Sequence, residues 1–166
     1  MKEALFYIKK KNNTVACALC NHRCRIRSGK RGICGVRENR DGCLYSLVYG
    51  RLAAENVDPV EKKPLVHFLP ASLSYSLATV GCNFSCMHCQ NYQISQYPHM
   101  HQGDIAGTPR TPEQVVEAAT QSGCQSISYT YVEPTIFYEF AHDCMALAHT
   151  YGLANIFVSN GYMTPE

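Results

Sequence analysis

The chain has 166 residues, enough for one domain with a small appendage, and 46% of them are hydrophobic, as expected for a packed globular core. A formal net charge of +2, from 15 basic and 13 acidic residues, gives no support for binding to nucleic acid or to an anionic membrane surface. No apolar run is long enough to cross a bilayer, and residues 1–11 lack the form of a signal peptide. We therefore expect a cytoplasmic protein with no nucleic-acid or membrane partner.

The ten cysteines indicate metal binding. In a small secreted protein this number would fit a disulfide scaffold, but without an export signal we expect reduced thiols that bind metal. Five cysteines lie within Cys17–Cys43 and three within Cys82–Cys89. Cys124 and Cys144 lie apart, in segments predicted as strand and helix, and we expect both to be small core residues.

The first segment, residues 1–49, shows no sustained apolar period, and we predict a small cysteine-rich module held by metal. Four soft ligands follow one another closely, at Cys17, Cys20, Cys24 and Cys34. They fit either a tetrahedral zinc site or an additional iron–sulfur cluster, and the spacing does not choose between them. A nucleic-acid-binding knuckle lacks the aromatic residues needed for base stacking, and free reduced cysteines are the other alternative.

Residues 50–70 are interpreted as a connector, because Pro59, Pro64 and Pro70 interrupt long regular elements. From residue 71 the pattern changes to alternating strands and helices. Residues 73–80 alternate as a strand that ends at Gly81, and residues 82–90 form the loop after it.

A long loop is predicted for residues 97–109, which contain two prolines and two glycines. Thr111 then provides an N-cap, with Pro112 at the first helical position and Gln114 completing a capping box. The helix that begins there is expected to end at Gly123.

The remaining elements continue the alternation. Residues 125–132 have strand-like composition, Pro134 begins a second helix that ends before Gly152, and residues 156–159 form a third short strand. Strands and helices in this order with short links predict an α/β fold with parallel strands and right-handed crossovers. In βα barrels the chemistry lies on loops at the carboxyl ends of the strands, where the second cysteine group is expected.

That second group, Cys82, Cys86 and Cys89, has the spacing C-x3-C-x2-C. Three thiolates occupy three corners of a [4Fe-4S] cluster and leave the fourth iron without a protein ligand, which favours chemistry at that iron over electron storage. The alternatives are a zinc site or inert buried thiols. Zinc motifs, however, usually consist of two separate cysteine pairs.

This cysteine loop, with the strand and Gly81 before it, resembles the radical S-adenosylmethionine (SAM) superfamily. The resemblance implies that the free iron binds the amino and carboxylate groups of SAM. One electron from the reduced cluster then cleaves the sulfonium to methionine and a 5'-deoxyadenosyl radical. His88 stands where the family places a ring along the adenine; the alternative is a solvated loop histidine.

The resemblance extends to the end of the second predicted strand, where the family carries a Gly-Gly-Glu-Pro-like motif. Glu133-Pro134 matches that motif, while Thr130 to Val132 replace the glycines. The resemblance implies that Glu133 and Thr130 hold the amino group of SAM. Alternatively, Glu133 is a first-turn acid that complements the helix dipole.

The third strand ends in a polar stretch that contains Ser159 and Asn160. Side chains at this edge are expected to contact the cofactor. The alternative is an ordinary turn with Asn-Gly chemistry.

Four segments together resemble the radical SAM enzymes of the AmmeMemoRadiSam system, which are relatives of pyruvate formate-lyase activating enzymes. The segments are residues 17–24, 32–37, 58–68 and 81–95. Asn21 departs from the proline that is common in the family and leaves the ligands unchanged. The resemblance implies a reducing electron donor of the flavodoxin or ferredoxin type. The resemblance does not identify the substrate. If the kinship with the activases extends to the substrate, a protein glycine is expected.

Family members continue through further βα units, whereas this chain stops at Glu166. We therefore expect a cysteine-rich module followed, in residues 71–166, by the amino-terminal half of a radical SAM βα barrel. Two other functions fit the same residues: a non-catalytic iron–sulfur electron carrier and a zinc-binding interaction module.

Overall fold

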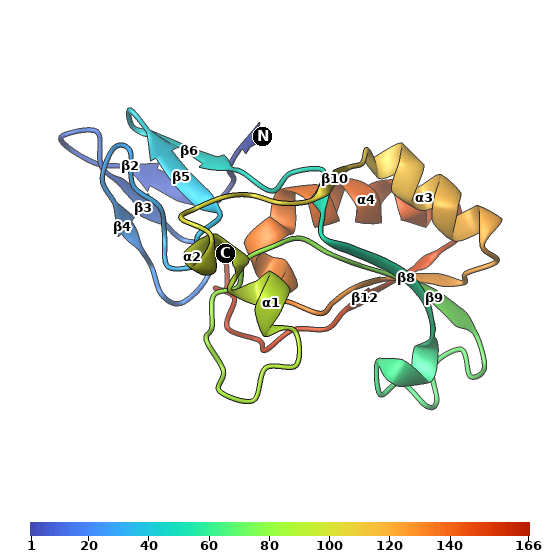
Figure 1. Cartoon of the computed structure of the whole chain (residues 1–166). Coiled ribbons are helices and arrows are strands. Elements are labelled where there is room, and N and C mark those ends of the chain that lie inside the picture. Colours follow the sequence, from blue (N-terminus) through green and yellow to red (C-terminus); the bar gives the residue numbers. More distant parts are fainter.

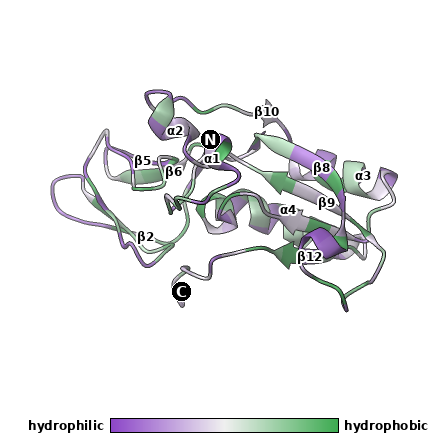
Figure 2. Cartoon of the chain, turned by 60° about the horizontal axis from the view of Figure 1, so that its bottom comes forward, coloured by the Kyte–Doolittle hydropathy of each residue, from purple (hydrophilic) through white to green (hydrophobic).

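The computed structural model describes all of residues 1–166. The amino-terminal module is built from short antiparallel strands, at one end of the molecule in Figure 1. These strands are β1 (Lys2–Glu3), β2 (Tyr7–Lys9), β3 (Val15–Cys17), β4 (Arg25–Ile26), β5 (Arg37–Arg40) and β6 (Cys43–Ser46). They form two three-stranded sheets, in the orders β2-β3-β4 and β1-β6-β5. The outer loops of this module are largely hydrophilic (Figure 2).

The rest of the chain forms an α/β unit. Its strands are β7 (Arg51–Leu52), β8 (Ala54–Pro59), β9 (Leu73–Ala78), β10 (Thr108–Pro109), β11 (Ser126–Tyr129) and β12 (Ala154–Phe157). Its helices are η1 (Val60–Lys62), α1 (Tyr92–Ser95), α2 (Tyr97–Met100), α3 (Pro112–Gln121), η2 (Pro134–Phe137) and α4 (Tyr138–Thr150). None of them is long and apolar enough to span a membrane.

The main sheet has the strand order β12-β11-β9-β8. Strands β9, β11 and β12 are parallel, as predicted, with Ser126 of β11 opposite Ser74 of β9 and Ala154 of β12. Helix α3 connects β9 to β11, and η2 with α4 connects β11 to β12. Two βα units therefore follow one another, which places the carboxyl ends of the three parallel strands at one edge of the sheet.

Strand β8 differs from the sequence prediction, which made residues 50–70 a connector. It pairs antiparallel with β9 from Ala54 opposite Ala78 to Pro59 opposite Leu73. β8 is an edge strand and much of its surface faces solvent, so its sequence lacks an apolar period. Pro59 is tolerated because it ends the strand at an edge of the sheet.

The helix predicted after Thr111 is confirmed as α3, together with its capping box. The backbone N–H of Gln114 donates to Thr111 Oγ1, and the backbone N–H of Thr111 donates to Gln114 Oε1. The segment 97–109, predicted as a loop, instead contains α2 and β10. These elements are four and two residues long, too short to produce a periodic sequence signal.

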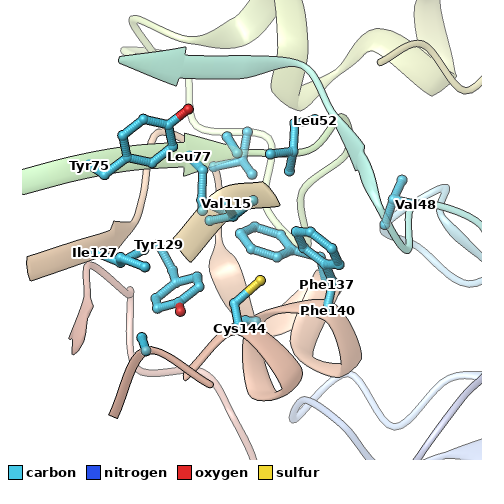
Figure 3. Close-up of a cluster of buried hydrophobic side chains, with 14 of the residues drawn as sticks. Val48, Leu52, Tyr75, Leu77, Val115, Ile127, Tyr129, Phe137, Phe140 and Cys144 are labelled. Carbon is cyan, nitrogen blue, oxygen red and sulfur yellow. The ribbon is translucent and has the colours of Figure 1, made fainter. Parts of the chain in front are cut away.

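The hydrophobic core lies between the main sheet and the helices α3 and α4, as Figure 3 shows. Phe137 and Phe140 pack below Val115 and beside Tyr129, and all four are buried. Cys144 is fully buried in the same cluster and Cys124 is nearly so, which confirms that both are small core residues.

A buried ion pair joins the module to the α/β unit. Arg37 of β5 donates two hydrogen bonds to the carboxylate of Glu139 in α4, at 2.9 and 3.0 Å. The same two side chains bind the backbone of Leu5. Arg37 donates to the carbonyl oxygen of Leu5, and the backbone N–H of Leu5 donates to Glu139. Both side chains are almost fully buried, so this contact fixes how the module sits on α4.

Candidate functional site

The predicted cysteine loop lies where the sequence placed it, directly after β9 at the carboxyl end of the strand. Gly81 begins the loop with φ +94°, a conformation that glycine adopts without strain. A Cβ at this position would lie 2.5 Å from Val36 Cγ1 and 2.8 Å from the carbonyl oxygen of Cys34. Glycine is therefore required here, because the start of the loop presses against the amino-terminal module.

The three cysteines of the loop differ in exposure. Cys86 is exposed, whereas Cys82 and Cys89 are half-buried. The backbone N–H of Cys89 donates to the carbonyl oxygen of Cys86 at 3.2 Å, and Cys89 Sγ lies 3.6 Å from Ser95 Oγ. The loop thus keeps two thiols near the body of the protein and presents the third to solvent.

Burial raises the pKa of the Cys82 thiol, while the backbone amides of Phe84 and Glu133, which face its sulfur, act in the opposite direction. These amides are suited to a thiolate that is bound to a cation. No three His, Cys, Asp or Glu side chains lie close enough to share one metal ion. A [4Fe-4S] cluster does not require this, because each thiolate binds a different iron atom. Three thiols on one short loop therefore fit such a cluster.

Glu133 is the centre of a hydrogen-bond network at the carboxyl ends of β11 and β12. Its carboxylate is buried and accepts bonds from the N–H and the hydroxyl of Thr135, which follows in η2. Ser159 Oγ donates to it at 2.8 Å, and so does the backbone N–H of Asn160. The structure thus brings together Glu133, Ser159 and Asn160, three residues that the sequence singled out.

Asn83 connects this network to the cysteine loop. Its side-chain oxygen accepts a hydrogen bond from Asn160 Nδ2 at 3.3 Å, and Cys82 Sγ lies 3.9 Å from the same oxygen. The sequence analysis did not identify Asn83, because an asparagine inside a cysteine motif has no distinguishing spacing. A continuous chain of polar contacts therefore runs from Cys82 to Glu133.

The comparisons with known proteins agree with this geometry. The sequence profile of the Radical SAM superfamily matches residues 76–166, more than half of the chain. The chain belongs to the radical SAM superfamily. Members of this superfamily typically use a [4Fe-4S] cluster and SAM, so a radical SAM-type function is supported.

Two relatives of this radical SAM protein come from Methanocaldococcus jannaschii. Uncharacterized protein MJ0808 is 46% identical over 166 residues, which is 100% of this chain and 49% of that protein. Uncharacterized protein MJ0674 is 34% identical over 87 residues, 52% of this chain and 21% of that protein. The chain thus spans about half the length of MJ0808. No solved structure matches it.

The chain keeps the backbone conformation of a glycine at a position where the family motif has glycine and this chain has tyrosine. Tyr131, between Thr130 and Val132, has φ +64°, in the left-handed region that glycine adopts most easily. Its carbonyl oxygen accepts a hydrogen bond from Asn91 Nδ2 at 2.9 Å. The departure from the Gly-Gly-Glu-Pro-like motif is therefore one of sequence, and Asn91 stabilises the unusual turn.

The Tyr131 side chain extends over the sheet to a group of charges. Its hydroxyl donates to Asp58 Oδ2 at 2.6 Å, and Lys63 Nζ lies 2.9 Å from the same oxygen. Burial alone would raise the pKa of Asp58, but the bonds from Tyr131, Lys63 and Lys62 hold it well below its usual range. Asp58 is therefore a stable carboxylate beside the radical SAM domain.

A cavity of about 450 Å³ opens beside this charge group. Asp58 and Lys63 line it together with Asn91, Thr130 and Tyr131. It adjoins the cysteine loop and the carboxyl ends of the parallel strands, the usual place for a ligand in this architecture. Of the predicted cofactor residues, buried Thr130 lines this cavity. His88 does not line it and lies exposed in the turn between Cys86 and Cys89, without a hydrogen bond.

The amino-terminal cysteines form a second group in the radical SAM protein. Cys17, Cys20, Cys24 and Cys34 line one small cavity in the module. Cys43 does not line it, and its sulfur accepts a hydrogen bond from Lys9. Burial raises the pKa of the Cys34 thiol to about 12.

Proposed function

We propose that Cys82, Cys86 and Cys89 hold a [4Fe-4S] cluster with one open iron, and that the chain forms part of a SAM-cleaving enzyme of the AmmeMemoRadiSam type. The observation that carries this proposal is the position of the cysteine loop. It lies at the carboxyl end of β9 and is joined through Asn83 and Asn160 to the ends of the neighbouring parallel strands. When bound, the cluster supplies the electron that cleaves the sulfonium of SAM.

The arrangement of the loop supports this assignment. Cys86 is exposed and Cys82 is half-buried, so a cluster on this loop has one side against the protein and one side open to a ligand. An exposed open iron is of little use to a protein that only stores electrons. This favours SAM cleavage over a non-catalytic electron carrier.

Glu133 is proposed to receive the amino group of SAM, together with Thr130. A carboxylate offers about four lone-pair sites, two on each oxygen. Oε1 of Glu133 accepts bonds from Thr135 and Ser159, whereas Oε2 accepts only one, from the backbone N–H of Asn160. Oε2 therefore keeps a site for an ammonium group. Ser159 and Asn160 are the less buried partners, so we infer that they also contact the bound cofactor.

His88 is proposed to lie along the adenine ring. It is exposed in the cluster loop and free of hydrogen bonds, so its ring can turn without breaking a contact. The reductant is proposed to be a flavodoxin or ferredoxin. By analogy with the activases, the substrate is proposed to be a protein glycine, and this last step rests on family resemblance alone.

The experiment reconstitutes the 166-residue chain with iron and sulfide under anaerobic conditions, adds dithionite and SAM, and measures 5'-deoxyadenosine by chromatography. We expect product that depends on all three additions. A chain that binds iron and sulfide but gives no product with SAM would instead be an electron carrier. A colourless chain with zinc at both cysteine groups would be an interaction module.

A further inference from the structure

The cavity in the amino-terminal module is lined by four thiols from separate places in the chain. Cys17 lies at the end of β3, Cys20 and Cys24 lie in the turn before β4, and Cys34 lies in the loop before β5. Cys17 and Cys34 are buried, and the other two are half-buried. Four thiols around one cavity, two of them buried, are typical of a structural metal site.

Two side chains in the wall of this cavity have buried N–H groups without a hydrogen-bond partner. They are Arg37 Nε and Asn83 Nδ2, and each side chain belongs to a residue that is 2% exposed. Leaving a buried donor unsatisfied costs about 1–3 kcal/mol. Thiolate sulfurs accept such N–H groups when a cation holds them in the cavity, and second-shell donors of this kind orient metal ligands.

The size of the cavity bears on which metal it would hold. Its volume is about 20 Å³, and by this measure a single water-sized occupant needs about 10–15 Å³. A cubane of four irons and four sulfides is far larger than one water molecule. The cavity therefore favours one ion over a second cluster, and four thiolates are the preferred ligands of zinc among single ions.

We propose that Cys17, Cys20, Cys24 and Cys34 bind one structural Zn²⁺ ion, whose thiolates accept hydrogen bonds from Arg37 and Asn83. The four thiols release their protons to solvent, and the sulfurs close from the cavity wall to the Zn–S distance of about 2.3 Å. The proposal includes this movement of the sulfurs, because in the structure no three of these side chains lie close enough to bind one ion.

The zinc site is connected to the cysteine loop of the radical SAM domain. His22, between Cys20 and Cys24, forms a hydrogen bond at 2.8 Å with the backbone oxygen of Asn83, the residue after Cys82. The side chain of Asn83 faces the zinc cavity and also holds Asn160. The ion therefore fixes the base of the cluster loop as well as the module.

The test uses the full 166-residue chain, purified with zinc in the medium and without iron–sulfur reconstitution, followed by elemental analysis. We expect one zinc per chain, and loss of that zinc in both Cys24→Ser and Cys34→Ser. Cys43→Ser and Cys86→Ser are the matched controls, since neither residue lines the cavity, and both should keep the ion. Replacing zinc by Co²⁺ should give the thiolate-to-cobalt absorption of a tetrahedral site.

A second variant tests the donors without removing a ligand. Asn83→Ala should weaken zinc binding about 10- to 100-fold in competition with a chelator, with the circular-dichroism spectrum unchanged. A folded chain without zinc, zinc retained by both cysteine variants, or iron and sulfide bound at these cysteines in Cys86→Ser would overturn the proposal. The zinc measurement is independent of SAM, so a failure of the deoxyadenosine assay leaves it standing.

Discussion

Cys86→Ala is expected to reduce 5'-deoxyadenosine formation by the reconstituted chain to the level of a sample without iron. The loop offers three thiols for three irons, and removing one leaves the cluster with too few ligands to persist. Cys86 is exposed and its side chain makes no hydrogen bond, so the substitution should leave the fold unchanged. Iron and sulfide analysis, run beside the product assay, checks that the cluster itself is lost.

Met87→Ala is the matched control for this prediction. Met87 is the next residue of the same loop and its side chain is fully exposed, yet it has no thiolate. We expect this variant to keep both cluster and product. Undiminished product from Cys86→Ala would show that the cluster is held elsewhere and would rule out the assignment.

Glu139→Gln is expected to lower the free energy of unfolding by about 3–5 kcal/mol. The substitution leaves the Arg37 guanidinium buried beside a neutral amide, which cannot compensate its charge. It also weakens the bond from Leu5, so the module loses its fixed position on α4. Urea unfolding followed by circular dichroism measures the change.

Glu117→Gln, on the exposed face of α3, makes the same chemical change without a buried partner. Its unfolding free energy should stay within about 0.5 kcal/mol of the parent chain. Equal stability of the Glu139 and Glu117 variants would contradict the role given to the ion pair.

Local signals in the sequence were sufficient for the parallel strands and for α3. The capping box at Thr111 involves residues three apart, so it needs no tertiary information. Strand β12 was expected two residues too late, at 156–159, because the apolar residues there extend past its paired region. Strand β8 was missed because an edge strand with polar side chains carries no periodic signal.

The sequence pointed to individual residues of the candidate site, but it did not predict the contacts between them. Glu133 was expected near the cofactor from the family motif, and Ser159 and Asn160 because they follow a strand. Their mutual hydrogen bonds join residues 26 and 27 positions apart. Tyr131 and Asn83 were missed. A tyrosine in a left-handed conformation has no local signature, because glycine is the usual marker of that turn.

The amino-terminal cysteines show the same limit. Their spacing identifies four ligands, but it cannot distinguish one ion from a cluster. That choice depends on the size of the cavity and on Arg37 and Asn83, which reach it only through tertiary folding. Asn83 lies 49 residues beyond the last of these ligands, Cys34.

The measurement closest to the central claim is electron paramagnetic resonance of the reduced, reconstituted chain with SAM labelled with ¹⁵N in its amino group. If Cys82, Cys86 and Cys89 leave one iron open, SAM will change the cluster signal, and electron–nuclear double resonance will show coupling to the labelled nitrogen. A cluster signal that is identical with and without SAM, and free of nitrogen coupling, would contradict the account.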